Sequence, residues 1–353
     1  MRILQVCPRY YPNIGGVEEH VRNMSERLVK NHEVTVATTD PTGKLSKEEV
    51  INDVKIVRFK SWAPSDAYYF SGSLKKYLKE TASNFDILHA HSYHAFPALY
   101  AAESKDCNKF VFTSHYHGTG HTLFRSLLHG PYKLFGGKIF DKADKIVCVS
   151  EYEKSLVKAG FNVDEKKLEV IPNGVNFAEF RGLKKPIKQG KTILCICRLE
   201  KYKGVQYLIE ALPKIDNGVS LEIVGSGPYA ENLTKLVRKK GVVDRVRFSH
   251  NLTRDELLEK YAESDVFVLL SSHEAYGLCV AEALAAGTPC IVADNSALSE
   301  WIDERNVFGI RFPLSLDELV SCVKMVIGKT VDAPALQDWD NVAQKIVTLY
   351  ECA

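Results

Sequence analysis

Short apolar runs alternate with amphipathic segments along almost the whole chain, and this alternation limits the possible folds more than any other feature. The segment after the first apolar run has apolar residues at helical spacing, at Val17, Val21, Met24 and Leu28. The apolar runs of the first half are RILQVCP, EVTVATT, VKIVRFK, FDILHAH, KFVFTSH and KIVCVSE. Continuous apolar runs flanked by helices are typical of a parallel sheet that is covered on both faces. We therefore expect an α/β fold of the doubly wound type.

The alternation breaks once, at the segment RGLKKPIKQGK, which is basic, contains Pro and Gly, and has no apolar face. We interpret this segment as an interdomain linker. Beyond it the pattern restarts with TILCICRL, VSLEIVGSG, VRFSH, DVFVLLSS and PCIVAD. A chain of 353 residues also exceeds one comfortable core. We expect Rossmann-like domains over residues 1–182 and 183–337, with a cleft between them at the carboxyl ends of both sets of strands.

Composition narrows the class of protein. The net charge of +2 argues neither for nor against nucleic acid, and we expect no nucleic-acid partner. No apolar run approaches the roughly 20 residues of a membrane span, and the N-terminal stretch lacks the apolar core of a signal peptide. The nine cysteines are scattered, several of them in apolar runs. Scattered thiols of this kind indicate reduced, buried cysteines in a cytoplasmic protein.

Histidines are concentrated in the first half. Six of the eleven fall within thirty-three residues, at positions 89, 91, 94, 115, 117 and 121. The pattern suits a metal site, a catalytic base with neighbours, or coincidence. HxH pairs at strand ends can bind zinc, so a metal hydrolase is one hypothesis. A metal hydrolase would need carboxylate ligands nearby, and this hypothesis does not explain the second half of the chain.

Two glycine-containing turns follow strands. Gly15 and Gly16 let the backbone approach a ligand closely at the start of a helix. The surrounding NIGGVEEH is not GxGxxG, which disfavours a nicotinamide dehydrogenase. Gly225 and Gly227 form a second turn, for which a tight turn without a ligand and a ligand-facing turn are equally open.

Two cations stand on the loop CRLEKYKG, directly after a predicted strand. Arg198 provides a fork and Lys203 a point charge, and together they suit a diphosphate. The alternative is a solvated basic loop, since Lys201 lies between them.

The stretch SSHEAYGLCVAEALAAGTPCIVAD places two carboxylates around a helix start. Glu274 lies on a turn, and a helix is predicted from about Leu278, with Glu282 on its second turn. The amides around Gly277 and Cys279 would expose a partial positive charge suited to phosphate. Carboxylates accept hydrogen bonds from pairs of sugar hydroxyls. The alternative for Glu282 is a structural arginine that satisfies its charge.

At these residues the chain resembles the retaining GT-B glycosyltransferases of family 4. The resemblance rests on Glu-x7-Glu, here Glu274 and Glu282, within an ordered set of segments spanning nearly the whole chain: GGVEEH, VSEYEK, IPNGVN, CRLEKYKG, VGSGP and EAYGLCVAEALAAGTPCI. It implies a GT-B fold and transfer of a hexose-type sugar from a nucleotide diphosphate sugar. It further implies retention of the anomeric configuration, without a metal or other cofactor.

The resemblance also implies roles for particular residues on the donor side. Glu274 would hold the hydroxyls of the donor sugar, and Glu282 would hold the ribose. The residues placed at the phosphates are Gly15, Gly16, Arg198, Lys203, Gly277, Leu278 and Cys279. Asn251 and Leu252 would lie near the base.

In the first domain, a histidine at the end of KFVFTSH would face the donor sugar through its ring or its carbonyl. His115 matches that position best, and His117 is the second candidate. The C-terminal residues 338–353 resemble a last helix that crosses back onto the N-terminal domain.

The acceptor is expected to be a glycan or a lipid-linked molecule that meets the N-terminal domain. The segment HTLFRSLLHGPYKLFGGKIFDKADK mixes Leu and Phe with Arg125, Lys133, Lys138 and Lys142. That composition suits a peripheral contact with anionic lipid at the inner face of the cell membrane. An ordinary core-packed helix with a solvated basic face is the alternative.

Several rival functions share the expected fold. A nucleotide-sugar epimerase, a soluble sugar or disaccharide synthase, a sugar phosphorylase and a catalytically silent nucleotide-sugar binding protein are the alternatives. The order of the motifs disfavours a phosphorylase, and the presence of all the expected site residues disfavours a silent protein. The sequence leaves the base, the sugar and the acceptor open.

Overall fold

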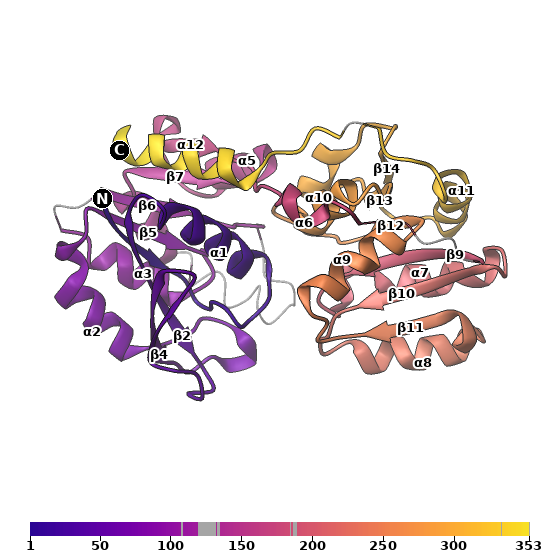
Figure 1. The fold of residues 1–353 in the computed structure, drawn as a ribbon, viewed down its shortest axis with the longest axis horizontal. Helices are drawn as coiled ribbons and strands as arrows, with labels where there is room; N and C mark the ends of the chain where they lie inside the picture. The colour runs from indigo at the N-terminus through magenta and orange to yellow at the C-terminus, as the bar shows by residue number, and fades with distance from the viewer. Residues whose placement is uncertain are drawn as a thin grey trace. The chain divides into compact units, whose positions relative to one another are not determined.

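The computed structural model describes residues 1–106, 109–118, 132, 135–183, 185, 189–332 and 334–352. The chain divides into two compact units (Figure 1). Unit 1 consists of Met1–Asn173 and Trp339–Ala353, and unit 2 of Gly174–Asp338. Each unit contains its own, mainly parallel, sheet. The expected α/β architecture with two doubly wound units is confirmed.

The boundary between the units differs from the expected one. The sequence places it between residues 182 and 183, whereas the structure places it between Asn173 and Gly174, and begins the crossing segment at Trp339 rather than at 338. The reason is a pairing that no local pattern encodes. The Val175 amide donates to the Gln337 carbonyl at 2.8 Å, and Val175 forms an isolated bridge with Asp338. These contacts hold the segment after Asn173 within unit 2.

Unit 1 is built on an eight-stranded sheet in the order β3-β4-β2-β1-β5-β6-β7-β8, parallel except for the antiparallel edge strand β3. Its strands are β1 Arg2–Val6, β2 Glu33–Asp40, β3 Glu48–Ile51, β4 Val54–Lys60, β5 Ile87–His91, β6 Lys109–Thr113, β7 Lys145–Cys148 and β8 Leu168–Val170. Its helices include α1 Gly16–Leu28, α2 Gly72–Thr81, α3 Phe96–Glu103, α5 Glu151–Gly160 and α12 Trp339–Cys352, with short 3₁₀ turns η1 Pro64–Asp66, η2 Ala82–Asn84 and η3 Glu165–Lys167.

Unit 2 is built on a six-stranded parallel sheet in the order β11-β10-β9-β12-β13-β14. Its strands are β9 Lys191–Ile196, β10 Val219–Val224, β11 Val246–Ser249, β12 Val266–Leu269, β13 Cys290–Ala293 and β14 Val307–Ile310. Its helices include α6 Phe177–Phe180, α7 Val205–Ala211, α8 Ala230–Lys240, α9 Arg254–Glu263, α10 Leu278–Ala285 and α11 Leu316–Val326. Its 3₁₀ turns include η4 Lys201–Lys203, η5 Leu212–Lys214, η6 Val243–Arg245 and η7 Ser296–Trp301.

The continuous apolar runs are explained by a sheet that is buried on both faces. In β12, Val266 and Val268 belong to one hydrophobic cluster, while the alternate residues Phe267 and Leu269 belong to another. Successive side chains of a strand point to opposite faces, so each strand needs apolar residues at every position. This is why the sequence pattern predicted parallel strands.

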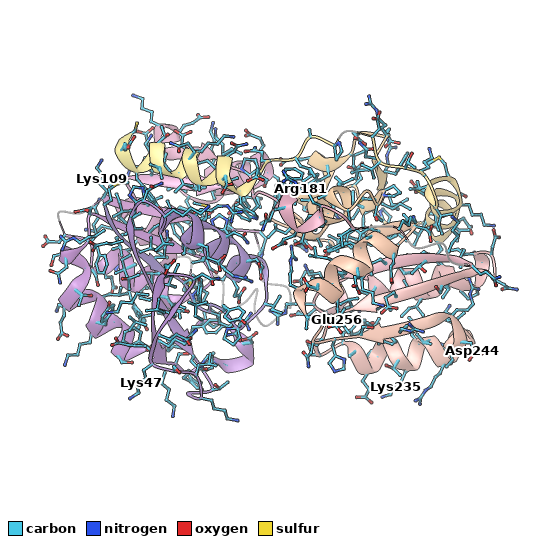
Figure 2. The ribbon with its side chains drawn as sticks, viewed as in Figure 1. Lys47, Lys109, Arg181, Lys235, Asp244 and Glu256 are labelled. Carbon is cyan, nitrogen blue, oxygen red and sulfur yellow. The ribbon has the colours of Figure 1, made fainter. Side chains whose placement is uncertain are left out.

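Helix starts follow the capping chemistry of the sequence. The Thr253 hydroxyl accepts from the amide of Glu256, and the Glu256 carboxylate accepts from the amide of Thr253, so the two form a reciprocal capping box at α9. Glu256 is labelled in Figure 2. Helices α2, α5 and α11 have a simpler cap, in which the side-chain oxygen of Ser71, Ser150 or Ser315 accepts from one backbone amide.

The C-terminal helix α12 belongs to unit 1 and is anchored there at several points. The Lys109 ammonium, labelled in Figure 2, donates to the backbone carbonyls of Tyr350 and Glu351. Arg27 of α1 pairs with Asp340 at 2.7 Å. These contacts hold the last helix on unit 1, where the sequence led us to expect it. Within the described residues, no helix combines the length and the apolar character needed to cross a bilayer.

Candidate active site

The sheet of unit 2 reverses its strand order at β9, which pairs with β10 on one side and β12 on the other. Loops that leave the carboxyl ends of strands at such a reversal form the ligand crevice of doubly wound folds. The chain leaving β9 carries Arg198 and Lys203, and the chain leaving β12 carries Glu274. The topology therefore assembles residues that are far apart in the sequence.

A half-buried ion pair lies at this crevice. The Lys203 ammonium donates to Glu274 Oε1 at 2.6 Å, and the two side chains are 13% and 16% exposed. Burial acts to lower the pKa of Lys203, but the Glu274 carboxylate together with Tyr202 and Cys197 outweighs burial, and the net direction is upward. Lys203 is therefore a permanent cation that can be shared between Glu274 and an incoming anion.

Of the two cations on this loop, Arg198 is more accessible to solvent than Lys203. Its side chain is 50% exposed, and its guanidinium lies 3.3 Å from the Glu200 carboxylate. The turn of Gly225 and Gly227 packs directly behind this loop. A Cβ atom at Gly225 would stand 2.0 Å from the Cys197 carbonyl oxygen, a distance that backbone atoms cannot tolerate. Close packing therefore accounts for these glycines without any ligand.

The N-terminus of α10 adds backbone donors beside the ion pair. Gly277 adopts a left-handed conformation with φ +97°, and α10 begins at Leu278 as the sequence predicted. The first intrahelical bond is donated by Val280 to the Gly277 carbonyl, so the amides of Leu278 and Cys279 precede it. The amide of Glu274 donates to the Ser296 hydroxyl at 3.2 Å, which holds the turn before α10.

Glu282 is engaged by two side chains of α9. Its Oε1 lies 2.6 Å from Arg254 Nη1, and its Oε2 accepts from the Tyr261 hydroxyl at 2.9 Å. Arg254 also donates to Glu179 at 2.6 and 2.9 Å. The sequence allows a structural arginine as the alternative to ribose binding by Glu282, and Arg254 is such a partner. A carboxylate oxygen can accept more than one hydrogen bond, so Arg254 and Tyr261 leave Glu282 able to accept from a ribose hydroxyl as well. Ribose binding by Glu282 stays a prediction.

The predicted base-side residues Asn251 and Leu252 follow β11, the edge strand on the same side of β9 as β10. Asn251 adopts a left-handed backbone with φ +55°, and Leu252 packs against a hydrophobic cluster of unit 2. Both residues therefore sit on a defined turn at the carboxyl end of the sheet.

In unit 1, the sheet reverses its strand order at β1, which pairs with β2 and with β5. The turn after β1 contains Gly15 and Gly16, and α1 starts at Gly16. A Cβ at Gly16 would meet nothing within 4 Å, so this position leaves open space beside the helix start. The buried Glu18 pairs with Arg9 at 2.7 Å and closes the turn.

The predicted histidines lie near the carboxyl ends of β5 and β6. The His115 ring lies 4.9 Å from that of His20, centroid to centroid, whereas the His117 ring stacks on His94 at 4.5 Å. The structure thus gives the two candidates for the sugar-facing role different surroundings. His121 lies outside the described residues, as do Arg125 and Lys133 of the segment expected to contact lipid.

Several polar residues around these histidines were not singled out in the sequence. His20 lies on α1, and Asn173 holds it through a 2.7 Å hydrogen bond between Asn173 Oδ1 and His20 Nδ1. Gln5 and Tyr350 bond to the histidines of β5. A polar residue at an apolar strand or helix position, such as Gln5 within RILQV, was the available signal.

A buried carboxylate organises the loop after β6. Glu153 of α5 accepts from the Ser114 hydroxyl and from the amides of Tyr116 and Val149. Burial raises the pKa of Glu153 to about 7, against the opposing effect of these hydrogen bonds. Glu153 therefore fixes the backbone on both sides of His115.

Two family models cover most of the chain. Residues 14–179 match the model described as Glycosyltransferase Family 4, and residues 177–314 match the model described as Glycosyl transferases group 1. The two matches meet close to the boundary between unit 1 and unit 2.

Individual relatives align over nearly their full lengths. An uncharacterised glycosyltransferase of Methanocaldococcus jannaschii is 29% identical over 393 aligned positions, covering 100% of this chain and 98% of that protein. A GDP-mannose-dependent alpha-(1-6)-phosphatidylinositol monomannoside mannosyltransferase of Mycobacterium tuberculosis is 27% identical over 351 positions, covering 91% and 88%. Among solved structures, sucrose-phosphate synthase from Thermosynechococcus elongatus superposes with a TM-score of 0.82 at 19% identity, covering 100% of this chain and 99% of that one. The fold is therefore GT-B, as the resemblance implied.

Proposed function

Because this chain belongs to the family 4 glycosyltransferases of the GT-B type, we propose that it transfers a hexose-type sugar from a nucleotide diphosphate sugar to a glycan or lipid-linked acceptor. The similarity to a GDP-mannose-dependent mannosyltransferase supports this class of donor and acceptor. The observation that carries the proposal is the Lys203–Glu274 pair at the strand reversal of unit 2.

The donor binds along the carboxyl edge of the unit 2 sheet. Arg198 and Lys203 neutralise the diphosphate, and the amides of Leu278 and Cys279 at the start of α10 donate to it. Glu274 accepts hydrogen bonds from the sugar hydroxyls. The remaining donor contacts are to the ribose and the base, from Glu282, Asn251 and Leu252.

Transfer proceeds on one face of the donor sugar, with retention of configuration. The bond between the anomeric carbon and the diphosphate oxygen breaks as the acceptor oxygen forms its bond to the same carbon. The departing diphosphate takes the proton of the acceptor hydroxyl. Charge develops on the diphosphate in the transition state, so Arg198 and Lys203 contribute most there.

This chemistry needs no metal ion, because protein cations and a helix terminus meet the diphosphate charge. Gly15 and Gly16 lie against the donor phosphates, with open space beside Gly16, and His115, with His117 as the second candidate, orients the reacting sugar. The backbone carbonyl of His115 can orient the sugar while the His115 ring contacts His20.

The deciding experiment is a panel of UDP, GDP and ADP sugars, tested by saturation-transfer NMR and thermal shift. We expect one donor to stabilise the protein specifically, because binding to the folded state raises its stability. Failure of every donor to bind would refute the proposal.

The product distinguishes transfer from its rivals and tests the mechanism. With the chosen donor and a chelator present, NMR of the product should show a new glycosidic bond with the donor's anomeric configuration. An epimerised nucleotide sugar would identify an epimerase, and a free disaccharide would identify a soluble synthase. An inverted product, or a trapped covalent glycosyl-enzyme, would contradict front-face transfer.

A flotation assay separates a lipid-linked acceptor at a membrane surface from a soluble one. If residues 121–145 bind anionic lipid at the inner face of the cell membrane, the protein should float with anionic vesicles and be released by salt. Absence of flotation would indicate a soluble acceptor and a solvated basic face, whereas flotation that salt does not change would show that apolar contacts, not the basic residues, bind the vesicle.

A further inference from the structure

Three histidines from separate parts of the sequence meet at the strand reversal of unit 1. His20 lies on α1, His91 is the last residue of β5, and His115 follows β6. One ring nitrogen of each lies within 4.8 Å of the other two. The ring centroids are 5.4 Å apart for His20 and His91, 4.9 Å for His20 and His115, and 6.1 Å for His91 and His115. Imidazoles that share one tetrahedral ion at ordinary bond lengths have centroids about 5 Å apart.

Hydrogen bonds behind His91 determine which of its nitrogens carries the proton. The Gln5 amide nitrogen donates to the Tyr350 hydroxyl at 3.2 Å, and Gln5 Oε1 lies 2.6 Å from His91 Nε2. A carbonyl oxygen can only accept, so Nε2 of the neutral ring is protonated and Nδ1 carries the lone pair. His91 Nδ1 is buried and has no hydrogen-bond partner among the described residues.

The same reasoning applies to His20. Asn173 Oδ1 accepts from His20 Nδ1 at 2.7 Å, which leaves the lone pair on Nε2. His20 Nε2 and His115 Nε2 are both buried without a hydrogen-bond partner in the part of the chain that the structure describes. Two of the three rings thus each have a lone pair on a buried nitrogen that no described residue satisfies.

Two of the three histidines are buried, and the third, His115, is partly buried. His20 and His91 are 1% and 0% exposed. Burial lowers the pKa of His20 to about 4 against the opposing effect of its hydrogen bond to Asn173, and burial followed by the neighbouring histidines lowers the pKa of His91 and of His115. Neutral imidazole is the form that binds metal ions. A buried lone pair without a hydrogen-bond donor is costly, and a cation bound to it removes that cost.

We propose that His20, His91 and His115 form a binding site in unit 1 for a divalent cation of the zinc class, such as Zn²⁺, Co²⁺ or Ni²⁺. Imidazole suits these ions better than Mg²⁺ or Ca²⁺, which prefer oxygen ligands. Asn173 and Gln5 accept from the outer nitrogens of their histidines, which is the usual support of metal-binding imidazole. Three protein ligands leave a fourth position for water or another oxygen ligand.

The cation would connect three elements rather than react. It would join the start of α1 to the carboxyl ends of β5 and β6, beside the turn of Gly15 and Gly16. His115 adopts a left-handed backbone with φ +46°, which is unfavourable for a residue other than glycine. A metal bond to its ring, together with the hydrogen bonds of Glu153 to Ser114 and Tyr116, would hold that conformation.

The test is metal content, measured on the full chain carrying an affinity tag without histidine. The protein is stripped with a chelator, loaded with Co²⁺, freed of excess and analysed by elemental analysis and visible absorption. We expect about one equivalent of Co²⁺ with the intense bands of a four-coordinate nitrogen site. Less than about a tenth of an equivalent, or the weak spectrum of six-coordinate aqueous Co²⁺, would overturn the proposal.

Variants assign the ion to these residues. His20→Gln and His91→Gln should each abolish retained Co²⁺, and Asn173→Ala should weaken its affinity about 10- to 100-fold. His250→Ala removes an exposed histidine of unit 2 and should retain the full equivalent. Thermal unfolding of the stripped variants verifies that each is folded. Undiminished Co²⁺ in folded His91→Gln would contradict the assignment.

The metal site and the transferase activity are two proposals that can be refuted independently. Co²⁺ content is measured without any nucleotide sugar, and transfer is measured with the stripped protein. Binding of Co²⁺ by a protein that transfers no sugar would refute only the proposed function. Transfer by a protein that retains no Co²⁺ would refute only the metal site.

Discussion

At the scale of single residues, the proposed chemistry of unit 2 depends on one ion pair between residues of two different loops. Lys203 and Glu274 balance each other's charge at 2.6 Å in a half-buried position. Removal of either leaves the other charge poorly compensated, and removes a group that the proposed reaction uses. Stability and activity must therefore be measured together.

We predict that Lys203→Ala and Glu274→Ala each lower kcat by about 10² to 10³, because each removes a charged contact that strengthens in the transition state. Lys201→Ala, on the same loop but exposed, is the matched control and should keep kcat within about twofold. Turnover is measured as nucleotide diphosphate release, with thermal unfolding verifying the fold. Wild-type turnover in either variant would remove these residues from the site.

Glu282 poses a question that substitution can answer, because its carboxylate already binds Arg254 and Tyr261. If it also holds the ribose, Glu282→Gln should raise KM for the donor about tenfold, as expected for loss of hydrogen bonds to a charged acceptor. Glu179→Gln removes the other carboxylate partner of Arg254 and should leave that KM unchanged. Equal effects of the two variants on KM would show that Glu282 acts only through Arg254.

At the scale of elements, turns place the functional side chains. The glycine turn after β10 packs against the loop after β9: the Leu199 amide donates to the Ser226 carbonyl at 2.8 Å, and a Cβ at Gly227 would stand 2.4 Å from the Leu199 carbonyl oxygen. A local backbone constraint thus sets where Arg198 lies.

We predict that Gly227→Ala destabilises unit 2 by more than about 1 kcal/mol and raises KM for the donor, because the added methyl group displaces the Arg198 loop. Gly218→Ala is the matched control, since a Cβ there meets nothing within 4 Å. Chemical denaturation and donor titration measure the two effects. If Gly227→Ala and Gly218→Ala have the same KM for the donor, the turn does not contribute to donor binding.

The loop after β6 depends on the protonation of Glu153. The folded state keeps this proton up to about pH 7, whereas the unfolded chain releases it near the ordinary value of 4.5. The folded state therefore binds more protons between these values, and Glu153 makes the free energy of unfolding decrease as the pH rises through that window.

We predict that Glu153→Gln removes this dependence. The stability of wild type relative to Glu153→Gln should fall by on the order of 3 kcal/mol between about pH 4.5 and pH 7. Urea unfolding of both proteins across this range measures the difference, and the comparison cancels the titration of the buried histidines. A constant difference would mean that Glu153 titrates normally.

At the scale of the whole molecule, the two ends of the chain complete the same unit. Tyr350 of α12 accepts from Gln5 of β1 and donates to His89 of β5, whose other nitrogen lies 2.8 Å from the Thr113 hydroxyl. The last helix therefore satisfies polar groups in the centre of the unit 1 sheet.

We predict that Tyr350→Phe destabilises unit 1 by about 1–3 kcal/mol, because it leaves buried groups of Gln5 and His89 without a partner. Thr348→Ala, at an exposed position of the same helix, should change stability by less than about 0.5 kcal/mol. Hydrogen exchange, resolved by peptide, should report the loss in unit 1 and leave unit 2 unchanged. Equal protection in both variants would show that the hydroxyl network carries no stability.

The sequence by itself determined the local elements, the family and the candidate residues of unit 2. Buried strands such as β12 follow from continuous apolar runs, the start of α10 follows from Gly277, and the motif order indicated the family. These features depend on residues that are neighbours in the chain, so periodicity and turn chemistry encode them.

Only the tertiary structure decided which distant residues meet. Strand order placed the loops after β9 and β12 side by side, so that Lys203 pairs with Glu274. It also brought His20 to His91 and His115, which the sequence had grouped instead with their neighbours His89 and His117. Long-range pairing moved the domain boundary to Asn173, through Val175 and its partners near residue 338. Strand order is a collective result of packing both faces of a sheet, and no local pattern of residues specifies it.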